Sequence, residues 1–89
     1  MSQFPYGKLP IKLTSGQEIV GAMAVQAVRW VNPTAGQSVS VTDASNNVIA
    51  AMTGPASTAD VWVPLPLPIQ VNGIAIGTIP SGNVFVYPA

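Results

Sequence analysis

The chain has 89 residues, enough for one compact domain, which we place over residues 1–89. It contains no Cys and no His, which excludes disulfide bonds, thiolate or imidazole metal ligands, and Ser-His or Cys-His catalytic pairs. Only 7% of the residues are charged, and the formal net charge is zero. A domain of this size buries only about 60–65% of its unfolded surface. We therefore expect it to be stabilised by other protein chains and to bind no cofactor.

The few charges also argue against nucleic acid and membranes as partners. The three basic residues, Lys8, Lys12 and Arg29, are spread along the chain and form neither a nucleic-acid footprint nor a lipid-binding cluster. The longest apolar stretch, residues 19–28, is about half as long as a membrane-spanning helix. Residues 1–6 (MSQFPY) lack the basic and apolar segments of a signal peptide, which predicts synthesis in a cytoplasm.

Residues 1–9 are predicted to form an extended arm ahead of a first strand at residues 10–14. Two aromatic side chains, Phe4 and Tyr6, lie in this arm, which would fray if it were isolated. Because aromatic side chains dominate the energetics of protein interfaces, we interpret Phe4 and Tyr6 as anchors that dock on a neighbouring subunit.

Residues 17–31 fit two kinds of secondary structure. Their apolar residues have a helical spacing, and a Ser and a Glu at the start match a capping box. Gly21 weakens a helix, however, and the many valines favour a strand over residues 23–31. We favour the strand, and residues 37–43 are then its expected hairpin partner.

The middle of the chain predicts a hairpin followed by a proline-rich connector. Residues 39–42 alternate between apolar and polar, and a turn-rich stretch at 43–46 leads into a second strand at 47–52. A short strand follows at 60–63. The run PLPLP at residues 64–68 lacks alternate N–H donors, so it cannot lie in the middle of a sheet. We interpret it as a connector between two sheets or as an edge segment.

The C-terminal part predicts two more strands. Asn72-Gly73 is a strong hairpin-turn signal ahead of a strand at 74–76, and the last strand covers residues 83–87. On that last strand the two valines face one side, and the Phe and Tyr face the other. About seven short strands predict an all-β fold, a small β-sandwich or jelly-roll-like domain, with a small β-barrel as the alternative.

Only three acidic side chains are available for acid–base chemistry. Glu18 resembles a cap or surface acid, Asp43 lies where it can bond nearby backbone amides, and Asp60 is expected to pair with Arg29 or with a partner chain. Nothing marks a point at which two of these acids converge. The sequence therefore predicts a protein that is not an enzyme.

The aromatic residues divide between core and surface. Trp30 lies among apolar residues and is predicted to be in the core. Trp62 fits a core or an interface position equally well, and Tyr87 is expected to reach the rim of the core or a contact surface. The predicted interface residues are therefore Phe4, Tyr6, Trp62 and Tyr87.

Two stretches of the chain resemble a known group of proteins. Residues 27–43 (AVRWVNPTAGQSVSVTD) are similar to the central hairpin of small β-sandwich virion proteins of tailed bacteriophages, and residues 73–87 (GIAIGTIPSGNVFVY) resemble their closing strands. The resemblance implies a head decoration (cement) protein in the virion, bound to the major capsid protein and present as a homo-oligomer, often a trimer. It carries over no catalytic residue.

Two other functions fit the same composition. One is a different virion part, such as a tail, neck or fibre-base component. The other is a carbohydrate-binding β-sandwich, in which Trp62 or Tyr87 would be a stacking platform for a sugar ring. Its hydrogen-bonding partners would be Gln26, Asn72 or Asn83.

Overall fold

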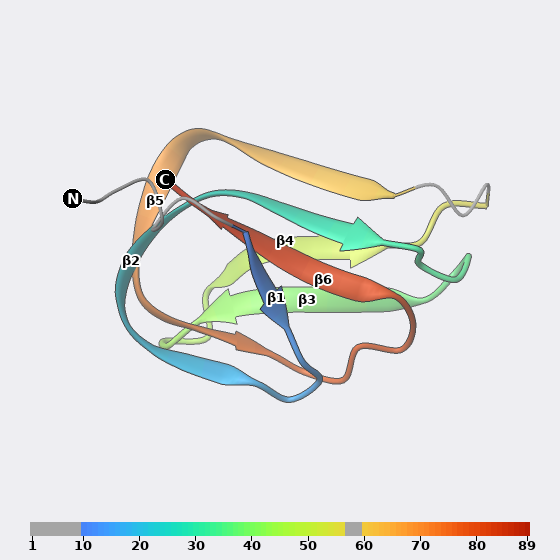
Figure 1. The fold of residues 1–89 in the computed structure, drawn as a ribbon, viewed down its shortest axis with the longest axis horizontal. Helices are drawn as coiled ribbons and strands as arrows, with labels where there is room; N and C mark the ends of the chain where they lie inside the picture. Colours follow the sequence, from blue (N-terminus) through green and yellow to red (C-terminus); the bar gives the residue numbers. More distant parts are fainter. Residues whose placement is uncertain (1–9, 57–59) are drawn as a thin grey trace.

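The computed structural model describes residues 10–56 and 60–89. In these ranges the chain forms strands and no helix, and all strands pair antiparallel in a single sheet of order β1-β6-β2-β5-β3-β4 (Figure 1). The strands are β1 (Ile11–Leu13), β2 (Glu18–Val31), β3 (Ser38–Asp43), β4 (Val48–Thr53), β5 (Val61–Ile76) and β6 (Asn83–Pro88). The predicted all-β class is confirmed. The predicted arm at residues 1–9, with Phe4 and Tyr6, lies outside the described residues.

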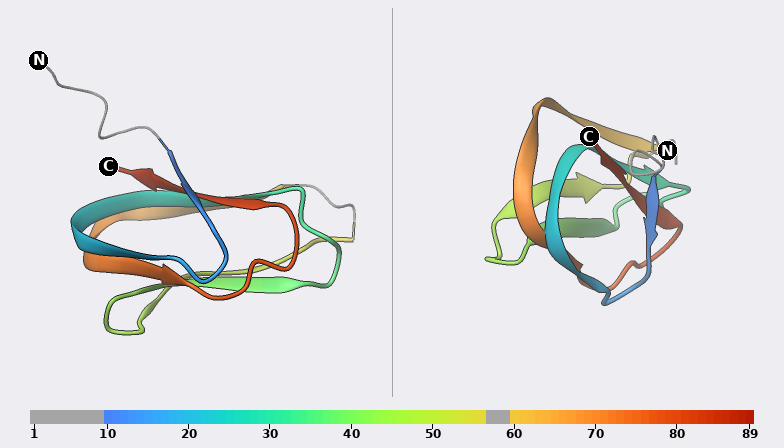
Figure 2. Two further views of the ribbon diagram at one scale, coloured as in Figure 1. Left: turned by 60° about the horizontal axis from the view of Figure 1, so that its bottom comes forward. Right: turned by 60° about the vertical axis from the view of Figure 1, so that its left-hand side comes forward.

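The sheet is folded over on itself because two of its strands are long and bent. β2 has 14 residues and β5 has 16, and both curve from one layer into the other (Figure 2). The β2–β5 register shifts between Val20 and Met23 and again between Val25 and Ala27. Gly21, with a φ of 130°, lies in the first of these shifts. Such irregularities bend a strand, so the sequence of β2 produces two packed layers from one sheet.

β2 confirms the strand favoured over residues 23–31 and begins earlier, at Glu18, but its partner is not the one predicted. The C-terminal half of β2 pairs with β5 on one side and with β6 on the other, so residues 37–43 cannot be its hairpin partner. Instead β3 pairs with β4 and β5 in the opposite layer. The turn after Val31 therefore crosses between layers, and in it Asn32 has a positive φ of 57° and Pro33 is buried.

The hairpin turn predicted at Asn72-Gly73 is also wrong. Gly73 lies inside β5, directly opposite Val20 of β2. A Cβ atom at position 73 would lie only 2.7 Å from the carbonyl oxygen of Ile19, so the glycine permits a close approach of two backbones. The hairpin predicted between residues 39–42 and 47–52 is present as β3 and β4.

The proline-rich run belongs to a strand edge, which was one of its two predicted places. Residues 61–69 of β5 pair with β2 alone, and β3 joins β5 only from Ile74 onward. Val25 pairs with Ile69 and Ala27 with Pro64, so residues 65–68 form a wide bulge opposite Gln26. Prolines are tolerated here because a bulge at an edge needs few ladder hydrogen bonds.

The core lies between the two layers and is aliphatic around one large aromatic side chain. Trp30 is completely buried, as predicted, and its indole Nε1 donates to the carbonyl oxygen of Ser81 at 2.7 Å. On β6, Val84 and Val86 are buried and face the core, as the alternation predicted. The rest of the cluster is Leu13, Val25, Val28, Val39, Val41, Ile49, Ala50, Met52, Val71, Ile74 and Ile76. Among the described residues no polar or charged side chain is buried.

Candidate functional site

The outer surface of the β1–β6–β2–β5 layer carries large side chains in two cross-strand rows. The register places Phe85 and Trp62 on either side of Arg29, and it places Tyr87 and Pro64 on either side of Ala27. Because Val28 and Trp30 point into the core, Ala27 and Arg29 point outward. We call this surface, made of Arg29, Trp62, Pro64, Phe85 and Tyr87, the aromatic face.

Trp62 and Tyr87 are in direct contact on the aromatic face. Their ring centroids are 5.1 Å apart and their planes lie at 76°, the edge-to-face arrangement that aromatic pairs favour. Ala27 lies beneath them and is only 3% exposed, yet it is not part of the core cluster, so the rings bury it from outside. Trp62 itself remains 52% exposed. The structure thus brings together the two predicted interface residues that it describes.

A hollow of about 410 Å³ opens beside these two rings. The bulge of β5 forms one wall through Leu65 and Pro68, and Gln26 lies at the side. Within the bulge, Leu67 is 76% exposed. Aromatic and proline side chains with exposed aliphatic neighbours are typical of surfaces that bind another protein.

An ion pair holds the start of β5 against β2 beside the aromatic face. Arg29 donates through Nη2 to Asp60 Oδ2 at 2.6 Å, which confirms the predicted pairing of these residues. The backbone N–H of Asn32 donates to the second carboxylate oxygen at 3.2 Å. Both contacts lower the pKa of Asp60, the Arg29 contact more strongly. The pKa of Arg29 is raised, first by Asp60 and then by the nearby Tyr87 hydroxyl.

Asp43 is held in the turn that joins β3 and β4. Its Oδ1 accepts the backbone N–H groups of Ser45 at 2.8 Å and Asn47 at 2.9 Å, and Asn47 also donates from its side chain. These bonds lower the pKa of Asp43, the backbone N–H of Asn47 most strongly. Its role is the backbone bonding expected of an Asp in a turn.

The two depressed carboxyl pKa values predict that the fold weakens in acid. A carboxyl group with a lower pKa in the folded state adds stability above its unfolded pKa of about 3.9, and this stability disappears as the pH falls through the folded pKa. We expect a Tm that is constant from neutral pH to about pH 5 and that drops below about pH 4. The Asp43→Asn/Asp60→Asn variant should lose most of this drop, as measured by thermal melts over pH. An unchanged drop in that variant would contradict the assignment.

The acids do not converge on one place. Glu18 and Asp43 lie on strands that flank β5 on opposite sides, and Asp60 lies at the other end of β5. Within residues 10–56 and 60–89, no cluster of three Asp or Glu side chains could hold a metal ion. The same residues contain no helix that is long and apolar enough to cross a membrane.

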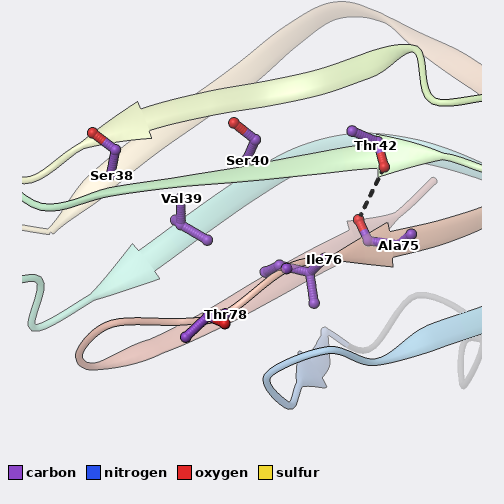
Figure 3. Close-up of a pocket in the computed structure, with 8 residues that line it drawn as sticks. Ser38, Val39, Ser40, Thr42, Ala75, Ile76 and Thr78 are labelled. Atoms are coloured by element: carbon purple, nitrogen blue, oxygen red, sulfur yellow. Dashed lines mark hydrogen bonds between the residues drawn. The ribbon is translucent and has the colours of Figure 1, made fainter.

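A second hollow, also of about 410 Å³, lies on the opposite layer between β3 and the end of β5 (Figure 3). It forms because β3 and β5 pair only from Val41 to Asp43, after which residues 77–79 leave β3. Those residues are held by the β1–β2 turn instead, where Ser15 Oγ accepts the N–H of Ile79 at 2.6 Å. The hollow is lined by small hydroxyl side chains and contains no charged group, so it offers no convergent chemistry.

The three amides considered as sugar-binding partners are separated in the structure. Only Gln26 lies at the aromatic hollow, and its Nε2 donates to the carbonyl oxygen of Pro88 at 3.2 Å. Asn72 lines a different hollow beside Glu18, and Asn83 lies opposite Val31 at the far end of β6. Trp62 lies on β5 and Tyr87 on β6, and these two strands lie on opposite sides of β2. The sequence did not reveal the contact between the two rings, because it depends on how both strands pair with β2.

The fold defines the class of the protein as a small all-β domain, built as a sandwich-like double layer from one bent antiparallel sheet. Comparison of the chain with protein-family models, with curated protein sequences and with solved structures gives no match. The function must therefore be argued from the surface of this domain.

Proposed function

We propose that the protein is a non-catalytic structural protein of a bacteriophage virion, a capsid decoration protein that docks on the head surface through its aromatic face. The observation that carries this proposal is the contact of the exposed Trp62 with the half-buried Tyr87 beside an open hollow, on a chain with very few charged residues. The resemblance of residues 27–43 and 73–87 to phage virion proteins is the reason for proposing a virion as the assembly that the protein joins. The expected partners are the major capsid protein and further copies of the chain, as in a trimer.

The aromatic face has the properties of a protein-binding surface. Trp and Tyr are the residues that most often anchor interfaces, because they bury a large area with few rotatable bonds. The Arg29–Asp60 ion pair at this surface lies within the domain and so presents little net charge to a partner. A partner can therefore cover the face without stripping water from an unpaired charge.

The state of the carboxylates supports a non-catalytic role. Asp60 is bonded to Arg29 and to the N–H of Asn32, and Asp43 is bonded within its own turn. Both pKa values are lowered, whereas a general acid or base works best with a pKa near the operating pH. These two acids therefore stabilise local structure.

Repeated weak docking explains how a domain of this size could stabilise a shell. Each copy would bridge neighbouring capsid subunits, and binding to the closed lattice would favour that state by mass action. Contacts made by linked copies add to one another through their effective concentration. Under these conditions each individual contact needs only a modest affinity for the full set of copies to stabilise the shell.

The proposal is tested by adding the protein back to virion heads that lack it. Wild-type protein should bind these heads and raise the temperature at which they break down. Trp62→Ala should bind at least about tenfold more weakly, since a central aromatic anchor contributes about 2 kcal/mol or more. Val20→Ala is the matched control, because Val20 is an equally apolar surface residue, 92% exposed, at the bend of β2.

Localisation separates the proposal from its alternatives. Antibody labelling of whole virions should place the protein on the head. Label on the tail or neck, or no label at all, would refute capsid decoration. Binding of a free glycan that depends on Trp62, without binding to heads, would instead indicate a carbohydrate-binding module.

A further inference from the structure

We propose that the free edge of β4 pairs with the same edge of a second copy of the chain, which joins two sheets about a two-fold axis. This contact lies on a different part of the molecule from the aromatic face, and it does not depend on the decoration role. It would make the free protein a dimer, in place of the trimer that the resemblance implies. The described sheet has four unpaired strand edges: β1, the first part of β2 (residues 18–23), the first part of β5, and β4.

The sequence blocks three of these edges. The open edge of β2 carries Glu18 and is interrupted by the register shift between Val20 and Met23, and a charge and a bulge both resist edge pairing. β1 has only three residues, follows Pro10 and carries Lys12, and a short charged edge resists pairing with another strand. The open edge of β5 runs along Pro64, Pro66 and Pro68, which have no N–H to donate. Prolines on an edge strand are a known device against edge-to-edge association.

The β4 edge carries none of these protections along its regular part. Its six residues, VIAAMT, include no charged residue and no proline. A bulge near Val48 interrupts the β3–β4 register, but from Ala50 to Thr53 the register is regular. Among the described strands β4 pairs with β3 and with no other.

The hydrogen-bond pattern shows which groups of β4 face outward. The N–H of Gly54 donates to the carbonyl oxygen of Gln37 at 2.8 Å, so residue 54 directs its backbone N–H toward the β3 side of the ladder. Bonded and non-bonded pairs alternate along an antiparallel ladder. Counting back by the register, Ala51 and Thr53 fall in non-bonded pairs with β3. Their N–H and C=O groups therefore point to the open edge, and both residues are exposed.

A second copy is the partner that this edge fits. Across a two-fold axis near Met52, the two β4 strands would run antiparallel, with Ala51 of one copy opposite Thr53 of the other. A charged residue near the axis would lie close to the same charge on the other copy, which destabilises a strand pair, and β4 contains none. The small side chain of Ala51 allows close approach. The zero net charge of the chain also leaves no long-range repulsion between copies.

The test removes one outward N–H group and leaves the β3 ladder intact. Wild-type protein should show twice the chain mass of 9.2 kDa by light scattering across micromolar to millimolar concentrations. Ala51→Pro should halve that mass, because its nitrogen faces the open edge. Ala51→Thr keeps the N–H group and should remain a dimer. Near-ultraviolet circular dichroism from the buried Trp30 checks that each variant is folded.

Amide hydrogen exchange on the wild-type protein gives a second readout that needs no variant. The amides of Ala51 and Thr53 should be protected in the dimer and should exchange freely when dilution produces monomers. A wild-type monomer at millimolar concentration would overturn the proposal. So would an oligomer, trimer included, that persists in Ala51→Pro, or a dimer in which these two amides exchange freely.

Discussion

Replacing Trp30 with alanine is expected to remove most of the stability of the domain. Trp30 is completely buried between the layers, and its Nε1 bonds the carbonyl oxygen of Ser81. A buried Trp→Ala change costs about 3–5 kcal/mol. A domain of 89 residues has a total stability of roughly 4–13 kcal/mol. Urea unfolding followed by circular dichroism should therefore show a midpoint near zero denaturant or a strongly reduced one.

The matched control for this experiment is the other tryptophan. Trp62 is 52% exposed and packs edge-on against Tyr87, so Trp62→Ala should cost no more than about 1.5 kcal/mol. Equal losses for the two variants would mean that Trp62 supports the fold and is unavailable as a docking anchor. The comparison thus separates the structural role of one Trp from the surface role proposed for the other.

Gly82→Ala is expected to be the most damaging change that adds only one methyl group. Gly82 has a left-handed φ of 65°, and a Cβ atom there would overlap the carbonyl oxygens of Val31 and Asn32. The adjacent Ser81 is fixed on both sides, because its carbonyl accepts from Trp30 and its hydroxyl accepts the N–H of Thr34 at 2.8 Å. The backbone therefore cannot move away to relieve the overlap.

We expect Gly82→Ala to lower the free energy of unfolding by at least about 2 kcal/mol, from the strained φ together with the overlap. For a domain of this size that corresponds to a fall in Tm of roughly 10 °C. Gly77→Ala is the control, because a Cβ at Gly77 meets nothing within 4 Å. Calorimetry on both variants decides the matter, and similar Tm values would show that the Ser81–Gly82 turn yields easily.

The sequence predicted strands and turns well where the signal for them lies within a short stretch of the chain. The burial of Val84 and Val86 follows from an alternation with a period of two. The hairpin of β3 with β4 follows from the same alternation together with the turn residues between the two strands. The strand predicted at residues 23–31, which lies within β2, followed from its valines and from Gly21 in spite of a helical spacing. Asp43 bonds its own turn, as an Asp in such a stretch does.

Pairing between distant segments was predicted less well. Asn72-Gly73 has the composition of a hairpin turn, but Gly73 is needed where the backbone of Ile19 approaches closely. The hairpin expected between residues 23–31 and 37–43 does not form, because β5 and β6 occupy both edges of β2. A turn signal reports the local chain alone and cannot report which strand arrives from elsewhere.

The sequence by itself determined the all-β class, the buried position of Trp30 and the scarcity of charge, since each depends on residue types or on local alternation. Only the tertiary structure decided that Trp62 and Tyr87 form one surface and that β4 is the last strand of the described sheet. Both features arise from the order of strands in the sheet. That order is set by contacts between residues far apart in the chain, such as those that Ala27 makes with Pro64 and Tyr87.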